Sequence, residues 1–178
     1  MTTEEMNRLI EKNMTSVFQF CCHLTGNRGE GEELCQDTFL KAMEIRQRAK
    51  CSEEGNEARN YFIGIAVNLW RNKRRKQKLR QWIAPVESGD EEAYLKIPDS
   101  TNVERHIVRT EAIETLKIQI RNLPDKQRVV IEMYYSVEMS MEEIAKTLHI
   151  SKETVKSRIR LAKQKLRKSM EAQGYEAE

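Results

Sequence analysis

Two short helices separated by a two-residue turn are the feature that most restricts how this chain can fold. Ser140 and Glu143 form an S-x-x-E capping box ahead of a helix over residues 141–148. After the turn, Ser151 caps a second helix, and apolar residues recur along it at every third or fourth position: Val155, Ile159, Ala162 and Leu166. Helices joined so closely must cross steeply, so the pattern predicts a helix-turn-helix.

The outward face of the second predicted helix is rich in cations. Such a face can be a solvated surface, but after a capped first helix it favours binding to a phosphate backbone. The first turns of a recognition helix lie nearest the base edges, which makes Lys156, Ser157 and Arg160 the candidate base readers. The other candidate DNA contacts on this helix are Lys152, Thr154, Arg158 and Lys163. His149, in the turn, is expected to adopt a positive φ rather than to bind a ligand.

Further helices are predicted on both sides of a central segment. Pro124 and Asp125 mark a helix start, and an apolar pattern predicts another helix over residues 107–120. With the helix-turn-helix these make a C-terminal bundle of about four helices, residues 106–178. An N-terminal unit, residues 1–80, contains a helix that ends near Gly26, a helix over residues 31–46 and a helix over residues 58–80.

The last N-terminal helix passes from an apolar half into the densest basic run of the chain. Seven of the ten residues 71–80 are cationic and none is acidic. This composition suits a surface that binds phosphates while polar or aromatic groups meet bases, although a core position is the favoured interpretation for Trp70. The candidate DNA contacts are Asn68, Arg71, Asn72, Arg74 and Arg75.

Residues 81–105 are acidic and contain proline and glycine, so we predict a flexible linker there. A solubilising spacer explains that composition, and a segment that enters a basic channel on another protein is the alternative. The predicted fold is all-α: two small helical domains joined by this linker. The net charge is only +3, so the separation of the charges along the chain, rather than their sum, indicates DNA binding.

Several classes of protein fit the sequence poorly. The four cysteines form no C-x-x-C pair, and we expect buried, reduced thiols and neither a metal nor a cofactor. The histidines are scattered and there is no phosphate-binding glycine loop, so we expect neither an enzyme nor a small-molecule substrate. With no signal peptide and no long apolar run, we expect a cytoplasmic protein that does not insert into a membrane.

Residues 31–43, G-E-E-L-C-Q-D-T-F-L-K-A-M, resemble the E-D-L-x-Q-x-T-F-x-x-A-W helix of the extracytoplasmic-function (group IV) sigma factors of bacterial RNA polymerase. In that family the helix docks on the clamp coiled coil of the largest catalytic subunit. The resemblance therefore implies polymerase-facing or supporting roles for Glu33, Leu34, Gln36, Asp37 and Phe39.

Residues 61–75 resemble the family's helix that engages the −10 element and helps to open the duplex, whose pattern is close to I-A-R-N-L-x-x-D-x-x-R-R. Val67 and Asn72 depart from that pattern, where the family has arginine and aspartate. By the same resemblance, the loop over residues 47–57 would hold a flipped −10 base.

The segment from Leu123 to Arg158 is similar to the family's −35-binding domain. The resemblance implies that Lys156, Ser157 and Arg160 face bases, the same set that the helical periodicity selects. His149 replaces the usual turn glycine, and Leu161 stands where some members place a cation.

The resemblance as a whole implies a promoter-specificity subunit without catalytic chemistry of its own. Its implied partners are core RNA polymerase, promoter DNA and an anti-sigma factor, often membrane-bound. A stand-alone helix-turn-helix regulator is the alternative function, and such a protein would bind duplex DNA tightly without polymerase, usually as a dimer.

Overall fold

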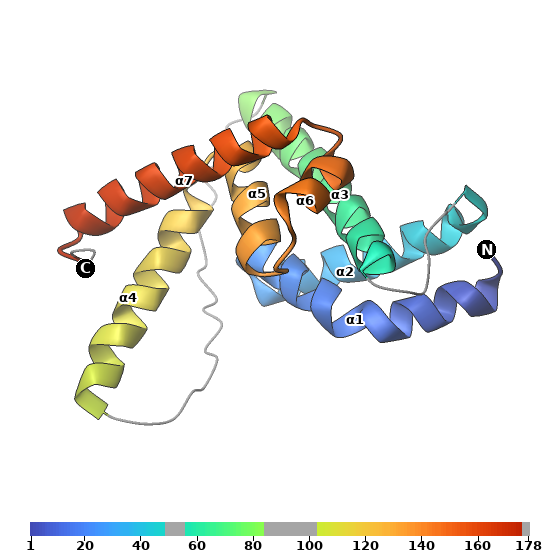
Figure 1. Cartoon of the computed structure of the whole chain (residues 1–178), viewed down its shortest axis with the longest axis horizontal. Coiled ribbons are helices and arrows are strands. Elements are labelled where there is room, and N and C mark those ends of the chain that lie inside the picture. The colour runs from blue at the N-terminus through green and yellow to red at the C-terminus, as the bar shows by residue number, and fades with distance from the viewer. Residues whose placement is uncertain (49–55, 84–102, 176–178) are drawn as a thin grey trace.

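The computed structural model describes residues 1–48, 56–83 and 103–175, with side chains from residue 111 onward in the last segment. These residues form seven α-helices, a short 3₁₀ turn and no strand, so the predicted all-α class is confirmed (Figure 1). Most of the predicted linker and of the loop over residues 47–57 lies outside the described residues. The domain boundaries, residues 1–80, 81–105 and 106–178, stay a prediction.

The first three helices form one group: α1 (Thr3–Thr25), α2 (Arg28–Glu44) and α3 (Glu57–Ile83). A capping box between Thr2 and Glu5 starts α1, and Gly26 ends it at φ 74°, a left-handed conformation that suits glycine. The next helix begins at once, because the Asn27 side chain accepts a hydrogen bond from the backbone of Glu30. Helix α2 therefore starts at Arg28, earlier than the start at residue 31 predicted from the sequence.

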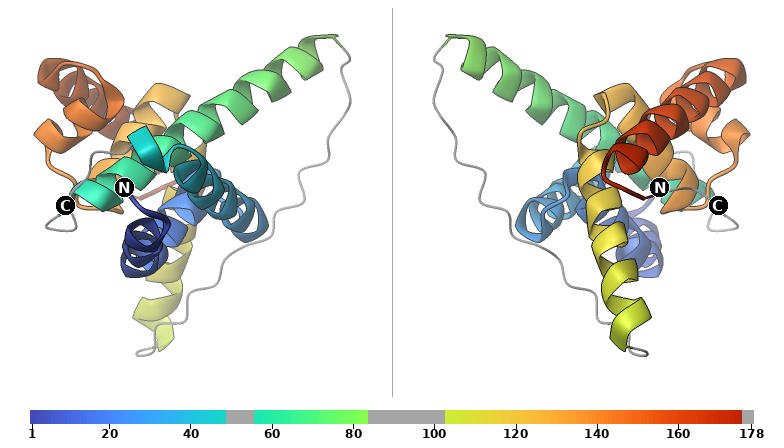
Figure 2. Two further views of the ribbon diagram at one scale, coloured as in Figure 1. Left: turned by 90° about the vertical axis from the view of Figure 1, so that its right-hand side faces the viewer. Right: turned by 90° about the vertical axis from the view of Figure 1, so that its left-hand side faces the viewer.

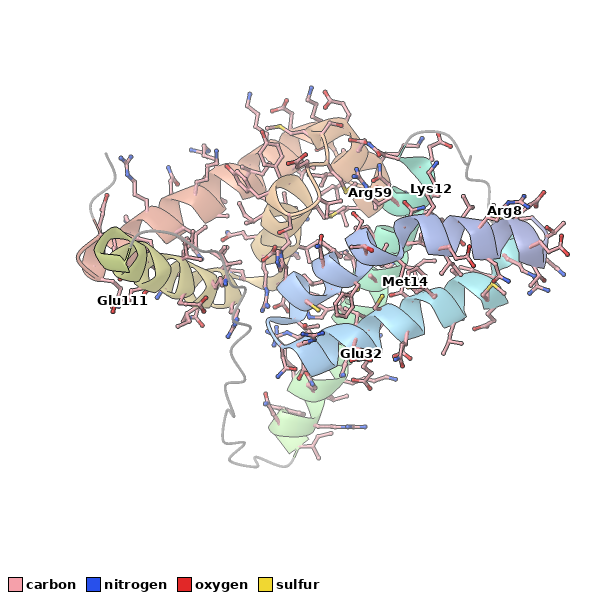
Figure 3. The ribbon with its side chains drawn as sticks, turned by 90° about the horizontal axis from the view of Figure 1, so that it is seen from below. Arg8, Lys12, Met14, Glu32, Arg59 and Glu111 are labelled. Atoms are coloured by element: carbon pink, nitrogen blue, oxygen red, sulfur yellow. The ribbon has the colours of Figure 1, made fainter. Side chains whose placement is uncertain are left out.

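Close packing of α1 against α2 creates most of the N-terminal core. Gly31 permits the approach, since a Cβ atom there would lie 2.6 Å from the Cα of Cys22. On the other side of α2, the Phe39 ring meets Phe62 of α3 edge-on, with ring centroids 5.3 Å apart. Figure 3 shows α1 and α2 side by side, with Arg8 on α1 and Glu111 on α4 at opposite ends of the view.

The remaining helices form the second group: α4 (Val103–Arg121), α5 (Asp125–Tyr135), α6 (Met141–Leu148) and α7 (Lys152–Ala172). The predicted helix-turn-helix is confirmed in α6 and α7. The Ser140–Glu143 capping box and the Ser151 cap are both formed, and His149 has a φ of 53°. The inward side chains Ile144, Val155 and Ile159 are buried and hold α7 against α5 and α6.

The two groups pack against each other, α1 against α5 and α3 against α6. The C-terminal half of α3 extends well beyond the helices around its first half (Figure 2). Its basic residues thus pass the start of α5 and the turn before α7, which brings the two cation-rich helices together.

Candidate nucleic-acid interface

The first turns of α7 present the predicted base readers to solvent. Lys156, Ser157 and Arg160 are exposed, while Val155 and Ile159 face the core. Lys156 and Arg160 form no ion pair with any of the described residues. Both cations therefore stay available to an external anion, as contact with DNA requires.

The other candidates on α7 lie close to residues of neighbouring elements. The Lys152 ammonium group pairs with Glu142, an interaction that raises the pKa of Lys152. Lys163 lies over the Tyr135 ring, 5.5 Å from its centroid. Thr154 and Arg158 are half-buried, and Arg158 approaches Arg71 of α3.

Two faces of α3 divide the predicted −10 residues between them. Asn68, Asn72 and Arg75 follow one another at four and three residues and are exposed, so they form one open face. Arg71 and Arg74 are half-buried on the neighbouring face, against the second group of helices. Only part of the predicted −10 surface is therefore open in this structure.

Asp125, at the start of α5, joins the two groups by charge. Its carboxylate accepts hydrogen bonds from Arg74 Nη2 at 3.0 Å and from Lys78 Nζ at 2.9 Å. Burial alone would raise the pKa of Asp125, but these hydrogen bonds outweigh burial and lower the pKa below its usual range. From the sequence, Asp125 was assigned only to the start of a helix, and Lys78 was not selected, although it continues the spacing of Arg71 and Arg74.

A second contact joins the first half of α3 to α6. The amide of Asn60 donates a hydrogen bond of 2.8 Å to Glu143 Oε1, so the capping carboxylate also ties the two groups together. One turn further, Gly64 faces Thr147, and a Cβ atom at Gly64 would lie 3.2 Å from Thr147 Cγ2. A Cβ atom alone needs only a small shift of the Thr147 side chain, but a longer side chain at Gly64 would push the two groups apart.

Aromatic and basic side chains fill the space between these contacts. Trp70 is buried, and the guanidinium groups of Arg74 and Arg128 lie 5.5 and 5.7 Å from the centroid of its ring. The favoured core position of Trp70 is therefore confirmed. Burial lowers the pKa of Arg128 to about 10.

Helix α2 carries the residues expected to face the polymerase. Glu33, Gln36 and Asp37 are exposed, and Glu33 pairs with Lys73 of α3 at 2.6 Å. Leu34 is buried and Phe39 is half-buried, so the structure gives both of them supporting positions. Leu40, which was not among the residues predicted from the sequence, is 68% exposed and follows Glu33 and Asp37 on the same side of the helix.

The described cysteines, Cys21, Cys22 and Cys35, are free and buried, and the neighbouring Cys35 thiol together with burial raises the pKa of Cys21. Within the described residues, no three histidine, cysteine or acidic side chains gather closely enough to bind a metal ion. None of the described helices has the length and apolar composition needed to cross a membrane.

Comparison with known proteins finds two matching family models. Residues 9–80 match sigma-70 region 2, and residues 120–168 match sigma-70 region 4. The chain is 29% identical over 157 residues to the ECF RNA polymerase sigma factor SigW of Bacillus subtilis, covering 86% of this chain and 82% of SigW. It is 26% identical over 172 residues to SigL of Mycobacterium tuberculosis, covering 95% and 90% of the two chains.

A solved structure supports the fold independently of sequence. The sigma factor RpoE, in its complex with the anti-sigma factor NepR from Bartonella quintana, superposes with a TM-score of 0.75 at 16% identity. The match covers 95% of this chain and 98% of RpoE. Both region models lie where the structure places the two cation-rich helices, and the relatives span most of the chain. The chain thus belongs to the sigma-70 family and is a promoter-recognising sigma factor of the extracytoplasmic-function type.

Proposed function

We propose that this sigma factor binds core RNA polymerase and directs it to promoters by placing α7 on the −35 element and α3 on the −10 element. The observation that carries the proposal is the presence of one exposed, polar or cationic helix face in each group: Asn68, Asn72 and Arg75 on α3, and Lys156 and Arg160 on α7. Two separated faces of this kind are what a protein needs to contact two promoter elements at once.

At the −35 element, α7 would enter the major groove by its first turns. Lys156, Ser157 and Arg160 would contact base edges, and lysine and arginine pair well with guanine there. Lys152, Thr154, Arg158 and Lys163 would bind phosphates and fix the orientation of the helix. Leu161 is 40% exposed beside this face and offers an apolar contact in place of a charge.

At the −10 element, the open face of α3 would capture unpaired bases. Unstacking a base costs a few kcal/mol, and amide side chains such as Asn68 and Asn72 can offset that cost by hydrogen bonding to an exposed base edge. Arg71, Arg74 and Arg75 would hold the phosphates of the separated strand. No covalent chemistry is needed for this step, so the chain would act as an initiation factor and not as an enzyme.

The surface of α2 offers a site for the polymerase. Exposed Leu40 is flanked by Glu33, Gln36 and Asp37, so an apolar anchor stands within a polar rim, as in many protein interfaces. Leu34 and Phe39 would hold this helix in position from the core side. Work on the polymerase would place the protein in the cytoplasm.

The packed arrangement would be the form of the protein that is not bound to a promoter. Arg74 is tied to Asp125, and α5 and α6 cover one side of α3. Binding of the −10 strand along this side requires the two groups to separate, so polymerase and DNA would select an open form. An anti-sigma partner, such as NepR is for RpoE, would select a form that cannot bind the polymerase.

Affinity for core polymerase tests the role of α2. We expect Leu40→Asp to weaken binding by about tenfold or more, the loss typical of an interface anchor. Met14→Asp is the matched control, since Met14 is an exposed apolar residue on α1, 48% accessible against 68% for Leu40. Equal affinity of Leu40→Asp and the wild type, or equal weakening by both substitutions, would refute the assignment of this face.

A further inference from the structure

A hollow of about 450 Å³ lies between the two groups, where the basic half of α3 passes the start of α5 and the helix-turn-helix. Five cationic residues line it: Arg71, Arg75, Lys78, Lys126 and Arg158. Three of them come from α3, one from α5 and one from α7. The hollow exists only while the two groups are packed together.

The charge of the hollow is not balanced by the residues that line it. Among the described residues that line it, Asp125 is the one acid, and its carboxylate already accepts hydrogen bonds from Lys78 and Arg74. Arg71 and Arg158 approach each other from different groups, and burial together with repulsion by Arg158 lowers the pKa of Arg71. Two partly buried guanidinium groups that line the same hollow would be stabilised by an anion between them.

The size and the remaining walls of the hollow indicate which anion fits. Pockets for small ligands usually enclose about 300–1,000 Å³, so the hollow has the volume for a compact molecule. Arginine side chains bind phosphate groups with two parallel hydrogen bonds, whereas lysine side chains supply point charges. Leu148 and Ile150 add an apolar wall against which a nucleobase can pack.

We propose that this hollow binds an oligophosphate, a small molecule with two or more linked phosphate groups that bridges Arg71 of α3 and Arg158 of α7. Because both groups of helices build the site, the bound anion stabilises the packed form. The anion and the promoter compete, since the same arginines are assigned to DNA. This consequence rests on the proposed function, whereas the binding itself does not.

Isothermal titration calorimetry of this protein with sodium tripolyphosphate tests the site. We expect saturable binding at one anion per chain, at least tenfold tighter than sulfate at matched ionic strength, because linked phosphates engage both arginines at once. Titrations with ATP and GTP then show whether the site takes a free oligophosphate or a nucleotide. An affinity for the nucleotides equal to that for tripolyphosphate indicates recognition of the phosphates alone, and a higher affinity for a nucleotide indicates that the base also binds. Sulfate binding as tightly as tripolyphosphate would show simple screening and overturn the proposal.

Matched variants locate the site. Arg71→Ala with Arg158→Ala should weaken tripolyphosphate binding by about tenfold or more, the loss expected for hydrogen bonds to a charged group. Arg80→Ala with Arg167→Ala removes the same charges from the same two helices at exposed positions outside the hollow, and should change the affinity less than about twofold. Equal losses in both pairs would overturn the proposal.

A long side chain at Gly64 tests the packed geometry without changing any charge. Gly64→Gln leaves every residue of the hollow unchanged but places a long side chain against Thr147, so it should open the packed form and abolish tripolyphosphate binding. Circular dichroism checks that both groups remain helical. Gly64→Ala, which adds only the Cβ atom, is the control and should keep the site. Unchanged binding by a folded Gly64→Gln protein would overturn the proposal without affecting the assignment as a sigma factor.

Discussion

The charge contact at Asp125 offers a direct way to open the packed form. Asp125→Asn keeps the size of the side chain and one acceptor oxygen but removes the negative charge that Arg74 and Lys78 share. We expect the open form to become more populated, because both ion pairs between the groups are lost together. The −10 surface on α3 should then bind DNA more readily in the free protein.

The size of the effect follows from the exposure of the three side chains. Asp125 is 25% exposed, Arg74 38% and Lys78 64%, so neither pair is fully buried. Partly exposed ion pairs contribute about 0.2–1 kcal/mol each, so the two pairs together contribute about 0.4–2 kcal/mol. Since 1.4 kcal/mol corresponds to a factor of about ten, the ratio of open to packed protein should rise by roughly 2–30-fold.

Two assays measure this change. Small-angle X-ray scattering reports the radius of gyration, which should increase as the two groups separate. Fluorescence anisotropy with a labelled single strand that carries the −10 sequence should show an affinity higher by up to the same factor, because less binding energy is spent on opening. Glu111→Gln controls for the general gain in DNA affinity on loss of an acid, since Glu111 is exposed on α4 (Figure 3).

The reasoning would be refuted by an unchanged radius of gyration together with a strand affinity equal to that of the Glu111→Gln protein. Gly64→Gln provides an opening variant that does not alter charge. An increase in strand affinity in Gly64→Gln alone would mean that shape, and not the ion pairs at Asp125, holds the groups together.

Three further predictions follow from individual side chains. Lys156→Ala and Arg160→Ala should each weaken binding to a −35 duplex by about 1–3 kcal/mol in a gel-shift titration, while Lys146→Ala on α6 should have little effect. His149→Gly should raise the free energy of unfolding by about 0.5–1 kcal/mol, and with it the midpoint of thermal unfolding, because glycine adopts a φ of 53° more easily than histidine. An unchanged or lower midpoint would show that His149 is not strained. The pKa of Asp125 is lowered, so its contribution to packing is complete above its ordinary pKa of 3.8 and is lost as the pH falls through the lowered value. The radius of gyration should therefore be constant from pH 7 to 5 and increase only in stronger acid.

Local signals in the sequence were sufficient to predict the helix-turn-helix. The capping box at Ser140, the cap at Ser151 and the positive φ of His149 are decided by residues within a few positions of each other, so periodicity and capping rules locate them. The base-reading set on α7 followed from the same periodicity, because the buried stripe leaves only one outward face. Asn27 shows the limit of this reasoning, since a cap directly after Gly26 moved the start of α2.

The packing of the two groups could not be predicted from the sequence. Asp125 was interpreted as a favourable charge at a helix start, and nothing near it in the chain indicates that Arg74 and Lys78 lie beside it. The hollow around Arg71 and Arg158 likewise depends on where α3 passes α7. Contacts between distant segments are set by the shape of whole surfaces, on which single residues carry little local signal.

Transcription by purified core RNA polymerase, with and without this protein, on a library of bacterial upstream regions tests the central claim most directly. The account predicts transcripts with defined start sites that require the protein and disappear when Lys156→Ala is combined with Arg160→Ala. Polymerase that gains no promoter specificity, while the protein alone shifts duplex DNA, would contradict the account and favour a stand-alone regulator.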